Sequence, residues 1–308
     1  MSGVLIGFAI IGFVIAVGYI VGKTGIAGPS ALYVLNRVAF FVATPALLFT
    51  VLSRAELRVV FSSFLLTTAL SVLIALVVYV LLSRLLFRRP VAETTVGAAA
   101  ASYVNANNIG LPVAIYVLGD PQYVAPVLLL QLLVIAPITL TVLDTATRGR
   151  ASVVSLLTQP LRNPMIIASM LGVIVAATGV QLPDAVMEPF QLIGAAAIPM
   201  VLMSFGISLV GQKPLAAGSG RRDVVAATVI KSVIMPAAAF LLARFVFSLD
   251  AEQVFAATVI AALPTAQNIY NFAARYERGV TLARDTVLLT TVASVPVLLV
   301  VAALLAPV

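Results

Sequence analysis

Residues 103–119 read YVNANNIGLPVAIYVLG, and residues 263–279 read LPTAQNIYNFAARYERG. Each stretch places a cluster of amide side chains within an otherwise apolar part of the chain. The two stretches lie 160 residues apart and are identical at six aligned positions: Ala106/Ala266, Asn108/Asn268, Ile109/Ile269, Ala114/Ala274, Tyr116/Tyr276 and Gly119/Gly279. This similarity indicates an internal duplication of the chain.

The composition is that of an integral membrane protein. Hydrophobic residues make up 62% of the 308 residues and charged residues only 9%, whereas soluble domains are about 45–50% apolar even with glycine counted. Apolar runs of about 20 residues can cross the hydrocarbon core as helices. We therefore predict an all-α membrane protein with ten transmembrane helices, over residues 3–22, 31–52, 60–83, 94–118, 123–143, 163–180, 187–210, 224–247, 253–274 and 284–306.

The basic residues are distributed unevenly over the predicted loops. If the N-terminus lies outside, only Arg54, Arg58 and Arg244 fall on the outer side. The positive-inside rule then predicts that both termini lie outside a bacterial-type plasma membrane. The net charge of +7 needs no nucleic-acid partner, because the basic loops face anionic lipid. The inner basic residues are Lys23, Arg84, Arg88, Arg89, Arg148, Arg150, Arg162, Lys213, Arg221, Arg222, Arg275, Arg278 and Arg284.

The absence of two residue types limits the chemistry. The chain contains no cysteine and no histidine, which excludes disulfides, thiolate nucleophiles, Ser-His-Asp triads and histidine-ligated metals. The acidic residues all fall in predicted loops or at span ends, so no intramembrane carboxylate is expected to carry a proton or a sodium ion. We predict neither enzymatic activity nor a bound metal or cofactor.

The duplication divides the chain into a first five-helix repeat (1–145), a cytoplasmic connector (146–162) and a second five-helix repeat (163–308). An odd number of spans per repeat inserts the second copy upside down, an arrangement found in many secondary transporters. A second pair of similar stretches surrounds Pro45 in span two and Pro199 in span seven, and both prolines predict helix kinks. The expected architecture is a 5+5 inverted repeat in which helices 4 and 9 are broken.

Helix-breaking residues coincide with the amide clusters in spans four and nine. Asparagine competes for backbone hydrogen bonds, glycine adds backbone freedom and proline removes a donor, so we expect unwinding around residues 104–111 and a matching break near 262–268. These breaks leave amides and free backbone groups at mid-membrane, where helix N-termini attract anions. The alternative is that the amides only bond one helix to another, but the matched breaks favour a substrate site. The predicted substrate-binding residues are Asn105, Asn107, Asn108, Gly110, Pro112, Pro264, Thr265, Gln267, Asn268 and Asn271, with Gln131 in span five as the weakest candidate.

Two cations lie within predicted spans. Arg37 and Lys231 are about seven residues, or roughly 10 Å, inside the cytoplasmic ends of spans two and eight. Their side chains either reach back to the membrane surface or point inward, where they would attract an anionic substrate. The sequence leaves both alternatives open.

Span one contains closely spaced glycines. Gly3, Gly7, Gly18 and Gly22 give small-xxx-small spacings, which are typical of close helix packing or of a dimer face. We favour packing within the monomer.

The motifs resemble the auxin efflux carrier family, whose bacterial members include malate and malonate permeases. The resemblance covers the whole chain and is carried by Gly110-Leu111-Pro112 after Asn105, by Ala261-Ala262-Leu263-Pro264, and by Phe272-Ala273-Ala274-Arg275-Tyr276. It implies that helices 4 and 9 cross, that a transport domain of spans 3–5 and 8–10 slides against a scaffold of spans 1, 2, 6 and 7, and that a homodimer forms through the scaffold. In plant members an asparagine at the crossover holds the substrate carboxylate. The matching residue is Asn105, and the proline that precedes it in the plant carriers is Val104 here.

The predicted function is that of a secondary efflux carrier for small organic carboxylate anions, working by an elevator-type alternating-access mechanism. Asn105, Asn108, Thr265 and Asn268 are expected to contact the carboxylate. Since no acid or histidine is expected within the membrane, we favour export driven by the membrane potential, which supplies about 2.3 kcal/mol per charge and 100 mV. Two alternatives remain open: a sodium-coupled symporter of the bile acid type, and a non-transporting membrane sensor or scaffold. The expected partners are the organic anion, membrane lipid and a second copy of the chain.

Overall fold

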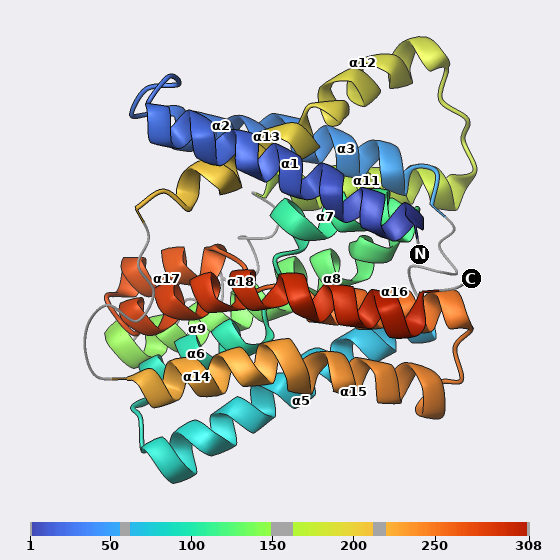
Figure 1. Ribbon diagram of the computed structural model, residues 1–308. Coiled ribbons are helices and arrows are strands. Elements are labelled where there is room, and N and C mark those ends of the chain that lie inside the picture. The colour runs from blue at the N-terminus through green and yellow to red at the C-terminus, as the bar shows by residue number, and fades with distance from the viewer. Residues whose placement is uncertain (1, 56–61, 149–162, 212–219, 307–308) are drawn as a thin grey trace.

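The computed structural model describes residues 2–55, 62–148, 163–211 and 220–306. Within these ranges the chain is helical and contains no strand element (Figure 1). The one contact of β type in the described residues is an isolated antiparallel bridge between Val104 and Thr265. The prediction of an all-α protein is therefore confirmed.

One group of helices forms the upper part of the molecule in Figure 1. Within it α1 packs mainly on α13, and α3 packs on α11 and α12. A short π-helical turn, Ala39–Ala43, connects α2 to α3. The α-helices of this group are α1 (Ser2–Thr24), α2 (Ala31–Val38), α3 (Thr44–Leu52), α11 (Pro164–Thr178), α12 (Asp184–Ala195) and α13 (Ala197–Ser208).

A second group forms the lower part of the molecule, where α5 packs on α6 and α15, and α18 packs on α14 and α16. Its α-helices are α5 (Ser63–Leu82), α6 (Val91–Ser102), α8 (Ala125–Leu130), α9 (Ala136–Arg148), α14 (Arg221–Val229), α15 (Met235–Leu241), α16 (Ala251–Ala262), α17 (Asn268–Tyr276) and α18 (Val280–Leu305). π-helical turns extend or join several of them, at Ser83–Phe87, Gln131–Ile135, Ile230–Ile234 and Leu242–Val246. A 3₁₀ turn, Pro121–Val124, leads into α8. Between the two groups lies the segment η3 (Ala106–Gly110), α7 (Leu111–Val113) and η4 (Ala114–Leu118), of which η4 packs on α1 and η3 packs on α13.

The helices have the length and surface of membrane spans. Among the described residues, seven helical segments are long and apolar enough to cross a membrane, and three apolar helices are shorter, at Ala106–Leu118, Pro164–Thr178 and Ala251–Ala262. Large apolar side chains are exposed on the outside of the molecule, for example Phe13, Leu85 and Val292. Such a surface is suited to lipid rather than to water. The protein is therefore a multi-pass membrane protein.

The glycines of the first span allow close packing within the chain. A Cβ atom added to Gly18 would collide with the backbone of Met203 in α13, and one added to Gly206 in α13 would collide with the carbonyl of Ile15 in α1. Gly22 likewise faces Ile207. Since small residues let helix backbones approach each other, these contacts bear out the prediction that the glycines of span one pack within the monomer.

The two scaffold-type prolines coincide with departures from α-helical geometry. Proline clashes with the carbonyl four residues before it, and that position is Phe41 for Pro45 and Ala195 for Pro199. Phe41 lies in the π-helical turn before α3, whereas Ala195 is the last residue of α12. A π-helical turn thus precedes Pro45 and a boundary between two helices precedes Pro199, and neither proline lines the cavity described below.

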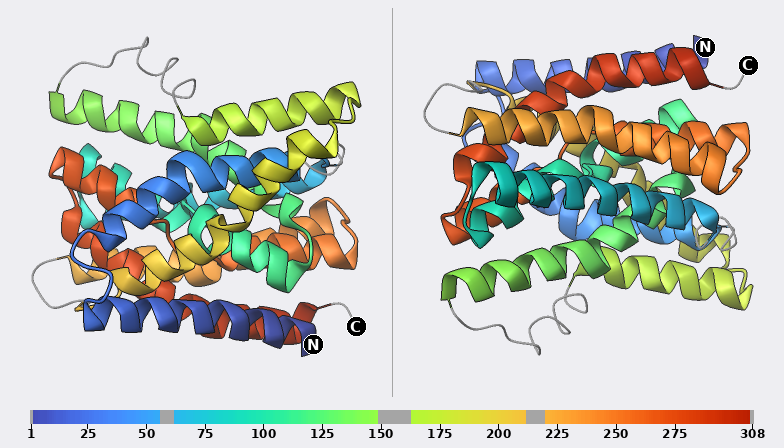
Figure 2. Two further views of the ribbon diagram at one scale, coloured as in Figure 1. Left: turned by 90° about the horizontal axis from the view of Figure 1, so that it is seen from above. Right: turned by 90° about the horizontal axis from the view of Figure 1, so that it is seen from below.

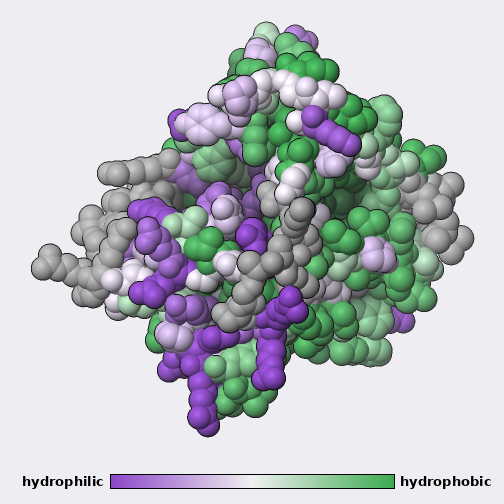
Figure 3. Space-filling model, turned by 60° about the vertical axis from the view of Figure 1, so that its left-hand side comes forward, coloured by the Kyte–Doolittle hydropathy of each residue, from purple (hydrophilic) through white to green (hydrophobic). Residues whose placement is uncertain are grey.

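Figure 2 shows that the Ser2 end of α1 and the Leu305 end of α18 lie together at one end of the molecule. Hydrophilic side chains gather on the left and lower part of the face in Figure 3, whereas its right side is largely hydrophobic. Near the start of α14, Arg89 donates two hydrogen bonds to Asp223, of 3.0 and 2.8 Å, and these bonds raise the pKa of the Arg89 guanidinium.

Two acids near span ends are buried, which their position in the sequence did not indicate. Asp223 lies in the first turn of α14 and Asp285 in the second turn of α18. Each is paired with an arginine, Asp223 with Arg89 and Asp285 with Arg284. A buried charge is tolerated when it is paired and hydrogen-bonded, and sequence position alone did not reveal the pairing.

Candidate functional site

The first amide cluster follows the end of α6. This helix ends at Ser102, and the backbone is then extended through Tyr103 (φ −82°, ψ 118°) before helical geometry resumes at Ala106. The non-helical stretch is therefore shorter than the predicted 104–111, because residues 106–110 form a π-helical turn. The Asn105 side chain caps this turn, since its Oδ1 accepts a hydrogen bond from the Asn108 N–H at 3.2 Å.

The second amide cluster follows the end of α16. That helix ends at Ala262, Leu263 is extended (φ −58°, ψ 149°), and α17 begins at Asn268. Proline at position 264 is compatible with this geometry, because the residue before a proline is biased toward extended conformations. The interruption lies near the place where the sequence predicted it.

The two interruptions contact each other directly. The Asn105 N–H donates to the Pro264 carbonyl at 2.8 Å, and the Ala266 N–H donates to the Tyr103 carbonyl at 3.2 Å. Together with the bridge between Val104 and Thr265, these bonds pair the two extended segments in antiparallel fashion. Backbone groups of the two extended segments thus partly satisfy one another, as a buried backbone requires.

Gln131 supports the first interruption. Its side chain oxygen accepts the Val104 N–H, and its Nε2 donates to the Val104 carbonyl at 3.1 Å. The fully buried amide of Gln131 therefore satisfies both backbone groups of Val104. In the sequence, Gln131 is the weakest of the amide candidates for substrate binding. Its partners are backbone atoms, which no sequence pattern identifies.

Thr265 supports the second interruption. Its N–H donates to the Thr290 hydroxyl at 3.0 Å, and its own hydroxyl donates to the Ala100 carbonyl at 2.6 Å. Ala100 belongs to the last turn of α6, where carbonyl groups lack helical partners. The fully buried Thr265 side chain therefore caps α6 from the opposite repeat.

Lys231 caps the other interrupted helix. Its ammonium group is fully buried and donates to the Ala261 carbonyl at 2.7 Å, in the last turn of α16. A cation at a helix C-terminus interacts favourably with the helix dipole. The side chain does not reach the membrane surface, and it does not line the amide cavity either. Arg37 behaves differently, because it is exposed, donates to the Tyr33 hydroxyl at 3.0 Å and stacks on the rings of Tyr33 and Phe41.

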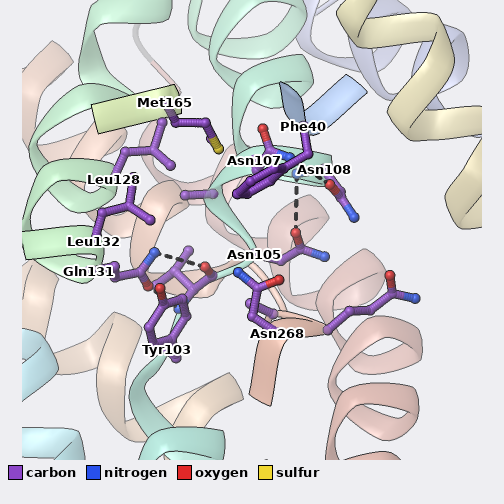
Figure 4. A pocket seen from close by; sticks show the side chains of 14 residues that line it. Phe40, Tyr103, Asn105, Asn107, Asn108, Leu128, Gln131, Leu132, Met165 and Asn268 are labelled. Atoms are coloured by element: carbon purple, nitrogen blue, oxygen red, sulfur yellow. Dashed lines mark hydrogen bonds between the residues drawn. The ribbon is translucent and has the colours of Figure 1, made fainter. Parts of the chain in front are cut away.

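A small cavity of about 50 Å³ opens where the interruptions meet (Figure 4). This space is sufficient for a few water molecules, each of which needs about 10–15 Å³ by the same measure. No charged side chain is among the residues that line it. The lining residues are the amides Asn105, Asn107, Asn108, Gln131, Gln267 and Asn268 together with Phe40, Tyr103, Val104, Ala106, Leu128, Leu132, Met165 and Ala266.

Two buried amide atoms at the first interruption have no hydrogen-bond partner among the described residues. They are the Nδ2 of Asn105 and the Oδ1 of Asn107. The neighbouring amides are engaged, since Asn107 Nδ2 donates to Asn108 Oδ1 at 2.9 Å and Asn268 is hydrogen-bonded to the Tyr103 hydroxyl. Buried polar atoms without a partner are costly, so the free Asn105 Nδ2 is the donor best placed for a ligand.

The structure brings five of the ten predicted substrate-binding residues to this cavity. They are Asn105, Asn107, Asn108, Gln267 and Asn268. Four others are buried but do not line the cavity: Gly110, Pro112, Pro264 and Thr265. Of these, Thr265 caps α6. Asn271 lines a neighbouring cavity instead.

Several residues of the site were not foreseen. Tyr103 holds Asn268, Thr290 accepts the Thr265 N–H, and Phe40 and Met165 bring apolar walls from the upper helix group. A Thr290 hydroxyl within span ten is a weak signal in the sequence, because threonines in such helices usually bond their own backbone. The apolar wall residues have no sequence signal, because hydropathy identifies a span without showing which face points inward.

Comparisons with known proteins agree with each other. The sequence profile of a family described as "Membrane transport protein" matches residues 4–156 and 147–302. A protein of Rhizobium meliloti (strain 1021) named "Putative malonate transporter" is 25% identical over 288 residues, which cover 91% of this chain and 89% of the relative. Both matches point to transport rather than to an enzymatic reaction.

Proposed function

Because the chain belongs to the auxin efflux carrier family of membrane transport proteins, we propose that it is a secondary carrier that exports small organic carboxylate anions. The observation that carries this proposal is the cavity between the two interrupted helices, which is lined by amides and holds a buried, unpartnered Asn105 Nδ2. Amide N–H groups and helix N-termini bind a carboxylate through neutral dipoles. The name of the Rhizobium relative makes malonate the first substrate to test.

The anion would bind between donors from both interruptions. Asn105 and Asn108 come from the first and Asn268 from the second, at the start of the nine-residue helix α17. The positive end of this helix adds to the attraction for an anion. Thr265 is left out of this set, because its hydroxyl already donates to Ala100 and is fully buried.

The proposed mechanism is of the elevator type. The chain would form ten spans as two inverted repeats, with the breaks in helices 4 and 9 crossing at mid-membrane. The helices of the lower group in Figure 1 would then carry the crossed breaks past the upper group, which would stay fixed in the membrane. The division of helix contacts into two groups supports this proposal, as does the position of Phe40 and Met165 of the upper group against a cavity built mainly by the lower group.

The direction of transport follows from the charge distribution. Basic residues in the loops away from the termini would suit the cytoplasmic side, and both termini would then lie outside. An inside-negative potential favours outward movement of an anion by about 2.3 kcal/mol per charge and 100 mV. Export of a carboxylate therefore needs no coupled ion.

The decisive experiment replaces Asn105 with alanine. In inverted vesicles, we expect Asn105→Ala to abolish uptake of radiolabelled malonate or of a related carboxylate while the protein level is unchanged. Asn163→Ala serves as the control, because Asn163 only caps α11 and does not line the cavity. Normal flux in Asn105→Ala refutes the site, and flux that requires a sodium gradient identifies a sodium-coupled symporter instead.

A further inference from the structure

A second cavity lies between the two helix groups, next to the amide cavity. It opens between α2 and α13 on one side and α17 and α18 on the other. Its polar lining includes Asn36, Ser208, Gln267, Asn271, Arg284 and Thr291. We call this space the vestibule. Unlike the amide cavity, the vestibule is lined by a cationic side chain, that of Arg284.

The hydrogen-bond donors of the Arg284 guanidinium are only partly used by its acidic neighbour. Its Nε donates to Asp285 Oδ1 at 2.7 Å, whereas its Nη2 is buried and has no partner among the described residues. Thr291 also lines the vestibule, and its hydroxyl is likewise buried without a partner in the described part of the chain. Residues seven apart share one face of a helix. One face of α18 therefore presents a free guanidinium edge and a free hydroxyl to the same cavity.

These groups fit a carboxylate. A guanidinium forms short, charge-assisted hydrogen bonds with carboxylates, and a hydroxyl and the amide of Asn271 can donate to the remaining lone pairs. If Arg284 served only to pair with Asp285, its outer nitrogen would have no reason to be buried in a polar cavity without a partner.

Gln267 lies between the two cavities. It lines both of them, and its Nε2 donates to the Ser208 hydroxyl of α13 at 3.0 Å. This bond joins the second interruption to the upper helix group. Movement of the Gln267 side chain would connect the vestibule with the amide cavity.

We propose that the vestibule is a second carboxylate-binding subsite, in which Arg284 and Thr291 hold the anion before it passes Gln267 to reach the amide cavity. The proposal rests on the proposed export function and adds an access site to it. It assigns different tasks to the two cavities: the charged vestibule captures the anion and raises apparent affinity, whereas the neutral amide cavity carries it across.

The test separates capture from translocation. Acetate, malonate and malate are first compared in inverted vesicles, and the anion transported best is used to measure KM and maximal flux. We expect Arg284→Gln to raise KM by about tenfold or more, as loss of a hydrogen bond between charged groups does. Thr291→Val is expected to raise KM by about threefold to tenfold, since it removes a single neutral donor. Maximal flux should stay within about twofold of the parent in both variants, because translocation occurs elsewhere.

Arg275→Gln is the matched control. It removes a basic residue from α17 that stacks on Tyr276 and does not line the vestibule, so its KM should equal that of the parent. Since Arg284→Gln removes one charge of the pair with the buried Asp285, the double variant Arg284→Gln/Asp285→Asn repeats the measurement with both charges of the pair removed. The same increase in KM is expected.

The possible failures are distinguishable. If Asn105→Ala abolishes flux while Thr291→Val and the double variant keep the parental KM, the vestibule proposal is overturned and the proposed function stands. If no carboxylate is transported, or if Asn105→Ala transports normally, the proposed function fails and the vestibule proposal falls with it.

Discussion

The two interruptions meet as partners, but their polar groups are used differently. At the second interruption four groups are hydrogen-bonded within the protein: the Pro264 carbonyl, the N–H and the hydroxyl of Thr265, and the Ala266 N–H. At the first, Asn105 Nδ2 and Asn107 Oδ1 are buried and have no partner in the described residues. The second interruption therefore has these polar groups engaged within the protein, whereas the first keeps two amide atoms available for a ligand.

The supports of the two interruptions differ as well. The first depends on one neutral amide, Gln131, which satisfies both backbone groups of Val104. The second depends on Thr265 and Thr290, while Lys231 caps the carbonyl end of the helix before it. Removing each support should therefore lower the unfolding free energy by a different amount. The order of these amounts tests whether the two interruptions are supported differently.

The largest effect is expected at Gln131. Gln131→Leu leaves the buried N–H and carbonyl of Val104 without partners, and each buried unsatisfied group costs about 1–3 kcal/mol. We expect the unfolding free energy to fall by about 2–6 kcal/mol, measured by denaturant titration in detergent micelles. Gln191→Leu on the exposed face of α12 is the control and should be nearly neutral. A change in Gln131→Leu as small as in the control would show that Val104 does not need this support.

The second largest effect is expected at Thr265. Thr265→Val removes the hydroxyl that caps Ala100, with an expected loss of about 1–3 kcal/mol in unfolding free energy, whereas Thr265→Ser keeps the bond. Flux in vesicles should remain once protein level is corrected for, because Thr265 does not line the amide cavity. Loss of flux at unchanged stability would show that Thr265 contacts the substrate, as the sequence predicted. The second interruption would then bind substrate as well as support the structure.

The sequence predicted the regions in which regular helix ends, because proline, glycine and asparagine act on the backbone of their own segment. Asn105 and Pro264 therefore marked both interruptions from local chemistry alone. The supports could not be predicted in this way. Gln131, Thr265 and Lys231 act on backbone groups of other helices, so their roles depend on packing that hydropathy does not encode.

The π-helical turn at residues 106–110 could not be predicted from the sequence either. Residues 106–110 were expected to be unwound, yet they are helical with wider hydrogen-bond spacing. Such turns are frequent at functional sites, but Asn107, Asn108 and Gly110 in this one have low helix propensity. The Asn105 cap and the packing around Gly110, where an added Cβ would crowd Val124 and Leu263, favour the turn.

A smaller effect is expected at Lys231. Lys231→Met removes the cap of Ala261, which costs about 1–3 kcal/mol, but it also removes the penalty of several kcal/mol for burying an ammonium group. We expect these terms to offset each other, so that the unfolding free energy changes by less than about 1 kcal/mol and flux is retained. A loss as large as that of Gln131→Leu would mean that the second interruption depends on its cation as strongly as the first depends on its amide.

The smallest effect is expected at Arg37, which neither interruption uses. This exposed side chain stacks on Tyr33 and Phe41, and such contacts contribute about 0.5–1 kcal/mol at exposed sites. Arg37→Gln should therefore lower the unfolding free energy by no more than this amount and leave both KM and maximal flux unchanged in inverted vesicles. Since the sequence predicts similar depths for Arg37 and Lys231 in spans two and eight, a raised KM in Arg37→Gln alone would assign anion attraction to the exposed cation. The two halves of the chain would then differ at these cations as well as at the two interruptions.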